Sequence, residues 1–334
     1  MVKASANIGE FVYLQTFFFN PIKYLKMSIL VVGTMAYDAI KTPFGQTDKI
    51  IGGAATYIAY SASYFHKPIN LVSIVGGDFD FQEMENLKAR GADVSGVEVK
   101  QDGKSFFWSG VYHMDMNSRD TLVTDLNVLL EFNPVLPEAY KTSEYVLLGN
   151  IDPELQMKVL DQMSARPKLV VLDTMNFWMD VALEKLVAVI AKVDVLTIND
   201  SEARQLSGEY SLVKAAKKIL AFGPKYLIIK KGENGALLFH EENIFFAPAL
   251  PLEDVFDPTG AGDTFAGGFI GYIAKTGDIS FANMKRAIIY GSAMASFCVE
   301  KFGTERLKEL DIEEIRDRVE EFVSLSQFDV SIEE

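Results

Sequence analysis

A glycine-rich turn with an acid inside it is the part of this sequence best suited to chemistry. Asp257–Thr264 reads DPTGAGDT and runs directly into the mostly apolar stretch Phe265–Ile270. The first turn of a helix has backbone N–H groups without intrahelical partners, and these groups attract anions. A carboxylate at Asp263 would repel an anion that is only held, but it can take a proton from a hydroxyl that attacks a phosphoryl group. The turn indicates phosphoryl transfer, with helix capping by Asp263 as the alternative.

Two other phosphate-binding motifs fail on spacing. The dinucleotide fingerprint needs a third glycine where this turn has Phe265, and it belongs after an early strand. The P-loop needs a glycine five residues before its Gly-Lys-Ser, but Glu98 stands there before Gly103-Lys104-Ser105. An oxidoreductase and a P-loop enzyme are therefore both disfavoured.

Short apolar segments alternate with helix-like patterns along most of the chain. The expected strands are 29–33, 69–75, 145–148, 169–173, 195–198 and 226–230. The expected helices include 54–64, 81–90, 153–163, 183–193 and 212–222. This alternation predicts an α/β fold, in which a mostly parallel sheet lies between two layers of helices.

Polar residues lie at or just past the ends of several expected strands, namely Asp38, Asn150, Asp173 and Asn199. Active sites in parallel sheets form beyond the carboxyl ends of the strands. We therefore expect these side chains to line one site.

Two segments interrupt the alternation, at about 38–51 and 104–127. The first is rich in turn residues, and the second has strand-like alternation through Trp108 and Tyr112. Both are interpreted as antiparallel strands outside the main sheet.

The string from Asp257 to Ile270 resembles the second signature of the ribokinase-like, or PfkB, family of carbohydrate kinases. Three further matches follow in the family's order: Gly52-Gly53, the Asn199–Glu202 segment NDSE, and the Lys231–Ala236 segment KGENGA. The resemblance extends along most of the chain from about Met27. It implies a ribokinase-like three-layer αβα sandwich and a small β lid formed by segments 38–51 and 104–127.

The resemblance also implies roles at the phosphate side. Asp263 would be the general base, and the turn residues Gly260, Ala261 and Gly262 would form the anion hole. Asn199 and Glu202 would position Mg²⁺, with Glu202 acting through water, although a charge at a helix start is the alternative. The residues implied to line the nucleotide are Lys231, Gly232, Gly235 and Thr259. A plain β-hairpin is the alternative reading of 231–235.

The implied acceptor side departs from the family at two places. Asp38 would grip the hydroxyls of a polyol, although it also suits a turn at the lid hinge, and Gly52 and Gly53 would let the substrate approach the backbone. Tyr57 replaces the usual sugar-binding asparagine. The common Asp-x-Asn-x-Arg motif is altered after Asp173. The expected acceptor-side residues are Asp38, Gly52, Gly53, Tyr57, Asn150 and Asp173.

The family's cofactors are ATP and Mg²⁺, and in some members the loop at Asp257 assists a monovalent cation such as K⁺. A structural role is the alternative for Asp257. Some relatives dimerise through the lid, so a homodimer of that kind is a candidate assembly.

Composition narrows the choice of partners and location. The formal charge of −14 and the lack of basic clusters argue against nucleic acid and anionic membranes as partners. The single cysteine, Cys298, lies in an apolar helical pattern and fits a reducing cytoplasm. Residues 1–26 are apolar in places, but the run is too short and too interrupted for a membrane span. We expect these residues to form an extension outside the kinase domain of 27–334, with an arm packed on the surface or on a second subunit as the alternative.

The leading hypothesis is an ATP-dependent kinase that phosphorylates a hydroxyl of a small polyol. A monosaccharide or sugar acid is the first choice of acceptor, a nucleoside the second and a cyclitol such as inositol the third. Aromatic residues near the expected site (Tyr57, Phe107, Trp108, Tyr112, Phe177 and Trp178) suit stacking on a base or ordinary core packing. The rival from another class is a non-catalytic binder that keeps the fold.

Overall fold

The computed structural model describes residues 27–327, and its main sheet follows the order β14-β13-β12-β11-β10-β9-β1-β5-β6. Neighbouring strands pair in parallel from β12 through β11, β10, β9, β1 and β5 to β6. The pairs β12–β13 and β13–β14 are antiparallel. The strands are β1 (Ile29–Val32), β5 (Ile69–Gly76), β6 (Ala92–Lys100), β9 (Tyr145–Leu148), β10 (Leu169–Asp173), β11 (Val195–Asn199), β12 (Tyr226–Lys230), β13 (Ala236–His240) and β14 (Asn243–Ala247). The six strands expected from the sequence are all present, within a residue at each end.

The main sheet is buried on both faces, which explains its apolar strands. Ile29 and Val31 of β1 point into one hydrophobic cluster, and Leu30 and Val32 point into the other. Successive side chains of a strand point to opposite faces, so a strand between two helix layers must be apolar at every position.

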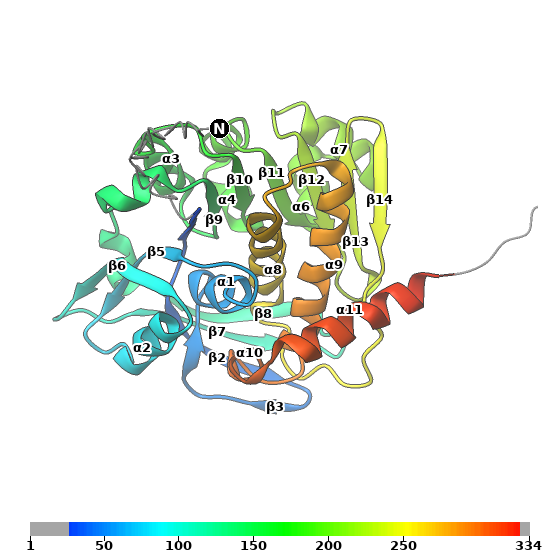
Figure 1. The fold of residues 1–334 in the computed structure, drawn as a ribbon. Coiled ribbons are helices and arrows are strands. Elements are labelled where there is room, and N and C mark those ends of the chain that lie inside the picture. The colour runs from blue at the N-terminus through cyan, green and yellow to red at the C-terminus, as the bar shows by residue number, and fades with distance from the viewer. Residues whose placement is uncertain (1–26, 328–334) are drawn as a thin grey trace, which may run out of the picture.

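Helices cover both faces of this sheet (Figure 1). On one face lie α1 (Ala54–Ala62), α2 (Phe81–Ala89), α8 (Ala261–Thr276), α9 (Phe281–Cys298), α10 (Glu305–Glu309) and α11 (Ile312–Ser326). On the other lie α3 (Pro153–Asp161), α4 (Asn176–Val181), α5 (Leu183–Ile190), α6 (Asp200–Ser207) and α7 (Leu212–Leu220). The predicted three-layer αβα sandwich is confirmed. Buried Cys298 at the end of α9 agrees with its expected place in an apolar helix.

A second sheet forms the lid, with the order β3-β2-β7-β8 and with β4 also paired to β2. Its strands are β2 (Ala36–Thr42), β3 (Gly45–Gln46), β4 (Ile50–Gly52), β7 (Phe106–Tyr112) and β8 (Arg119–Asp125). They lie together at the bottom of the view in Figure 1. Both segments expected outside the main sheet form strands of this second sheet. The expectation of antiparallel pairing is wrong for β2 and β7, which pair in parallel, whereas the other pairs are antiparallel. Asp38 lies inside β2 and not at the end of a main-sheet strand.

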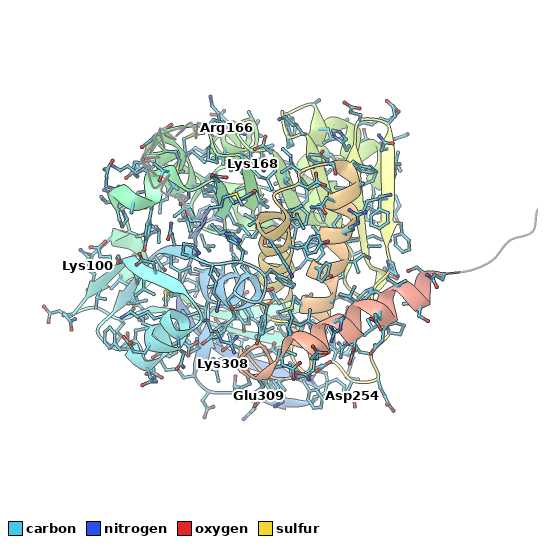
Figure 2. All side chains as sticks on the ribbon, viewed as in Figure 1. Lys100, Arg166, Lys168, Asp254, Lys308 and Glu309 are labelled. Atoms are coloured by element: carbon cyan, nitrogen blue, oxygen red, sulfur yellow. The ribbon has the colours of Figure 1, made fainter. Side chains whose placement is uncertain are left out.

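The C-terminal helices are fastened to α1 and α2 through a buried acid. Lys308 of α10 is labelled in Figure 2, and its Nζ donates to Glu83 Oε2 at 2.8 Å. The hydroxyl of Tyr60 donates to Oε1 of the same carboxylate at 2.7 Å. Glu83 is almost fully buried, so these two donors replace the water that its charge has lost.

The helices of residues 27–327 are all too short or too polar to cross a bilayer. The extension predicted at residues 1–26 lies outside the described part of the chain.

Candidate active site

The DPTGAGDT turn leads directly into α8, as its sequence indicated. Gly260 is the N-cap residue with φ of +75°, a left-handed conformation that suits glycine. A side chain at Gly260 would also collide with the ring of Tyr57. Glycine is therefore required here by both conformation and space.

Asp257 stabilises this turn by accepting two backbone hydrogen bonds. Its Oδ1 accepts from the N–H of Thr259 at 2.8 Å, and its Oδ2 accepts from the N–H of Gly303 at 2.9 Å. The side chain is fully buried, and burial raises its pKa. These two hydrogen bonds agree with the alternative prediction that Asp257 has a structural role.

The free donors at the start of α8 differ at one position from the expected anion hole. Ala261 donates its N–H to the carbonyl of Pro258 at 3.2 Å, which closes the turn. The N–H groups of Gly260, Gly262 and Asp263 have no acceptor within the described residues. The available donors are therefore Gly260, Gly262 and Asp263, because the turn itself uses Ala261.

Asp263 lies in the first turn of α8, among charges from three other elements. Burial and the nearby Asp173 carboxylate raise its pKa, and the positive charges of Lys230 and Arg119 act against them. The outcome is a pKa of about 7, far above the ordinary value for aspartate. A carboxylate with this pKa is suited to accept a proton near neutral pH.

Lys230 is a partly buried cation of the site, and sequence reasoning missed it. Its Nζ lies 3.2 Å from Asp173 Oδ1 and 3.3 Å from Oδ2. It also lies 3.0 Å from where a Cβ of Gly262 would be, so it borders the start of α8. Burial lowers the pKa of Lys230, but Asp173, Glu202 and Asp263 outweigh this effect and raise it overall. The amine therefore stays charged. Its place at the end of β12, in register with Asn199, is the signal that could have identified it.

Asn199 and Glu202 form a capping box at the start of α6. The N–H of Glu202 donates to Asn199 Oδ1 at 2.8 Å, and the N–H of Asn199 donates to Glu202 Oε2 at 2.7 Å. Burial raises the pKa of Glu202 to about 7, against the charge of Lys230. The capping box uses one oxygen of Glu202 and leaves Oε1 without a hydrogen-bond partner among residues 27–327.

Asp38 brings the lid into the site. It is 5% exposed, and burial raises its pKa to about 8, with smaller contributions from Asp257 and Asp263. Its carboxylate has no hydrogen-bond partner within the described residues, so both oxygens can accept bonds from a ligand. A side chain at Gly52 would collide with this carboxylate, which explains the glycine there. Gly53 has φ of +91° where the chain crosses Thr34, a structural requirement.

The other residues predicted to bind the acceptor, Tyr57, Asn150 and Asp173, pack against or bond to neighbouring residues. Tyr57 is 1% exposed in the core beneath Gly260, and its hydroxyl has no partner in the described chain. Asn150 accepts from Trp178 Nε1 at 2.8 Å and donates to Met175 Sδ at 3.0 Å. Asp173 is paired with Lys230. The ring of Tyr57 packs beneath the turn at Gly260, and its role toward an acceptor stays a prediction.

The loop 231–235 joins β12 to β13 as the tight hairpin that was the structural alternative. It contains the short 3₁₀ turn Gly232–Asn234. A side chain at Gly232 would collide with Asn117 from the lid hairpin, so the lid reaches this loop. Lys231 Nζ lies 5.6 Å from the ring centroid of Phe246.

Trp108 and Arg119 of the lid lie beside each other near the site, and the sequence did not predict this contact. Trp108 of β7 is the register partner of Asp38 on β2, so the two side chains lie on the same face of the lid. Arg119 of β8 lies with its guanidinium carbon 5.7 Å from the Trp108 ring centroid. Nothing in the local sequence distinguishes this face from the opposite one.

In residues 27–327, no three His, Cys, Asp or Glu side chains converge into a metal site of protein ligands alone. The sequence profile of the pfkB family of carbohydrate kinases matches residues 26–310. The chain therefore belongs to the pfkB family, whose members are phosphotransferases that use a hydroxyl acceptor.

Individual relatives agree with the family. A cytidine kinase of Thermococcus kodakarensis is 30% identical over 250 residues, covering 73% of this chain and 87% of that protein. A nucleoside kinase of Methanothermobacter thermautotrophicus is 25% identical over 292 residues, covering 83% and 91%. The crystal structure of a putative ribokinase II from E. coli with ATP and Mg²⁺ superposes with a TM-score of 0.73 at 19% identity, covering 90% and 99%. This last likeness confirms the ribokinase-like fold.

Proposed function

We propose that this chain transfers a phosphoryl group from ATP to a hydroxyl of a nucleoside, with Asp263 as the general base. The observation that carries the chemistry is the position of Asp263. It combines a pKa of about 7 with a place among free N–H donors at a helix start. A site that only binds phosphate does not need a general base at this position.

The residues at the start of α8 fit a phosphoryl group and its metal. The free N–H groups of Gly260, Gly262 and Asp263 and the Lys230 ammonium supply positive potential. The Oε1 atom of Glu202 is free to hold Mg²⁺ through water, as Mg²⁺ sheds its water shell reluctantly. ATP supplies the phosphoryl group, and Mg²⁺ neutralises part of its charge. We assign the nucleotide side to Asn199, Lys231, Gly232, Gly235 and Thr259.

The acceptor side favours a nucleoside over the monosaccharide preferred from sequence. Asp38 offers two free carboxylate oxygens to vicinal hydroxyls such as those of ribose. Trp108, its register partner, offers a flat apolar surface on the same face of the lid. The similarity to a cytidine kinase supports the same choice. A monosaccharide or sugar acid is the second candidate and a cyclitol the third.

The test is an ADP-release assay with Mg²⁺ and ATP across nucleosides, monosaccharides, sugar acids and cyclitols. We expect turnover with nucleosides and a loss of about 10²–10⁴-fold in kcat for Asp263→Asn. Nucleotide affinity should be largely kept. Asp254→Asn changes an exposed acid (labelled in Figure 2) just before the turn, and it serves as the matched control. Unchanged turnover in Asp263→Asn would refute the base assignment. ATP binding without turnover on any acceptor would favour the non-catalytic binder.

We also propose that a monovalent cation such as K⁺ lies beside Asp257. This carboxylate is fully buried, and it has no Lys or Arg partner within the described residues. A buried charge without a cation is unfavourable, so a bound ion is the simplest compensation. Replacing K⁺ by tetramethylammonium should lower activity, whereas equal activity in both salts would exclude the site.

A homodimer through the lid is proposed for the assembly. Strand β8 is an edge strand with every residue exposed, including Leu122 and Val123. Exposed edges of this kind tend to be covered by another chain. Light scattering should give twice the monomer mass, and a monomer at micromolar concentration would contradict it. The single buried cysteine supports a cytoplasmic location.

A further inference from the structure

Arg119 lies on the part of the lid that faces the phosphate-binding turn. It is the register partner of Tyr112, so the two side chains lie on the same face of the β7–β8 hairpin. The hydroxyl of Tyr112 accepts a hydrogen bond from Thr259 Oγ1 at 3.2 Å. Thr259 directly precedes Gly260, so this row of the lid touches the turn that begins α8.

The guanidinium of Arg119 has no acid of its own. No carboxylate in residues 27–327 lies within 4.0 Å of it, and its nearest recorded contact is the ring of Trp108. Its charge still reaches two acids on different elements. Burial raises the pKa of both Asp263 and Glu202, and Arg119 offsets part of that rise in each. Arg119 is thus an exposed cation without an acidic partner in the described residues, on the face of the lid hairpin whose Tyr112 contacts the turn at Thr259.

The site contains more acids than cations. Its acids are the buried Asp38, Asp173, Glu202 and Asp257 and the partly exposed Asp263, and the partly exposed Lys230 is a cation beside them. The phosphates of ATP add further negative charge to this region. One lysine, already paired with Asp173, leaves the developing charge of a transferring phosphoryl group under-compensated.

The lid also spans the distance from the turn to the nucleotide loop. Tyr112 touches Thr259 at one end of the hairpin, and Asn117 lies against Gly232 near its tip. Arg119 follows two residues after Asn117, so its backbone lies between the contact with the turn at Thr259 and the contact with the loop at Gly232.

We propose that Arg119 is a catalytic residue whose guanidinium contacts the transferring phosphoryl group, so that the lid delivers a cation as well as excluding water. This inference rests on the proposed phosphoryl transfer. In that step the acceptor oxygen forms a bond to the γ-phosphorus, and the bond to the bridging oxygen of ADP breaks. The hydroxyl proton goes to Asp263. Arg119 compensates charge and exchanges no proton.

The experiment compares Arg119→Gln, Arg119→Lys and wild type in steady-state turnover. We expect kcat to fall about 10²-fold in Arg119→Gln, with a smaller change in the KM of the acceptor. Lysine should restore part of the rate, and added guanidinium should partly rescue Arg119→Gln. Asp120→Ala, which removes the contact with His113 on the opposite face of the same strand, is the control for general lid damage.

A second measurement needs no turnover. Arg119 contacts the γ-phosphoryl group in the proposal, so Arg119→Gln should lose several-fold in affinity for MgATP and little for MgADP by calorimetry. An Arg119→Gln enzyme with kcat within twofold of wild type and an unchanged ATP-to-ADP preference would overturn the inference. Absence of wild-type turnover on every acceptor would instead count against the proposed function, and the calorimetry would still decide the role of Arg119.

Discussion

Lys230 reaches across a whole strand to pair with Asp173. The two residues end β12 and β10, and β11 lies between these strands in the sheet. The pair places a partly buried ammonium group at the carboxyl edge of the sheet, next to Gly262 and the start of α8. A cation fixed in this way needs no reorganisation when a phosphoryl group arrives.

Replacing Lys230 by methionine should therefore damage catalysis more than folding. We expect kcat/KM to fall by about 10²-fold or more, since a preorganised charge is lost beside the reacting group. Arginine at this position should retain part of the activity. Lys217→Met removes an exposed lysine on α7 and should leave steady-state rates unchanged. Equal rates for Lys230→Met and Lys217→Met would show that Lys230 is purely structural.

Activity should depend on pH through the carboxylates of the site. Asp263 faces Asp173 on β10, Lys230 on β12 and Arg119 on β8, and its pKa is about 7. The base must be ionised, so kcat/KM should fall about tenfold per pH unit below neutrality. Asp38, with a pKa of about 8, adds a second rise at higher pH if its ionised form binds the acceptor. A profile of kcat/KM that stays flat down to pH 5 would contradict the raised pKa of Asp263.

Asp38 should lower stability in its ionised form. Its pKa is about 8 in the folded protein and near 4 in an unfolded chain, so folding takes up a proton between these values. The contribution of Asp38 to stability is thus fully present below pH 4 and is lost as pH rises to 8. We expect urea unfolding at pH 8.5 to give Asp38→Asn a free energy of unfolding about 1–3 kcal/mol above that of wild type. The gain should be smaller at pH 5. The same variant should bind acceptor more weakly. A gain that is equal at both pH values would disprove the linkage.

The buried acid Glu83 gives a test of the fold away from the site. Lys308→Met removes its cationic partner and leaves a buried carboxylate with the Tyr60 hydroxyl and Asn86 as its other donors. We expect a loss of about 1–3 kcal/mol in the free energy of unfolding, because an uncompensated charge stays buried. Lys301→Met breaks the exposed pair with Glu309 (labelled in Figure 2) and should change stability by less than about 1 kcal/mol. Urea unfolding of the two variants should separate these cases. Equal stabilities would contradict a stabilising role for the Lys308–Glu83 pair.

Much of the fold could be predicted because local pattern decides it. The strand at 145–148 is apolar at every position, and such a run between helix patterns has few other uses in an α/β chain. Strand β6 was missed, since Ala92 is its one buried residue and its burial pattern is irregular. It also contains a register shift against β5 between Asn70 and Val72, which weakens any simple alternation.

The site was predictable where a motif occupies consecutive residues. The turn at 257–264 specifies its own geometry, and the structure places it at a helix start as expected. Lys230 and Arg119 were not found because their meaning comes from pairing between strands. The packing of Tyr57 could not be predicted for a related reason: Gly260, far along the sequence, leaves the space that its ring fills.

Asp38 lies on β2, the strand that holds β3, β4 and β7 together in the lid, whereas Asp263, Lys230 and Glu202 are carried by the main αβα layers. In the roles proposed above, the acceptor-binding residue and the reacting residues therefore lie on separate hydrogen-bonded frameworks. Substitutions in the first framework can retune acceptor preference while the second remains intact. A change of acceptor in this chain would then need changes in the lid sheet alone.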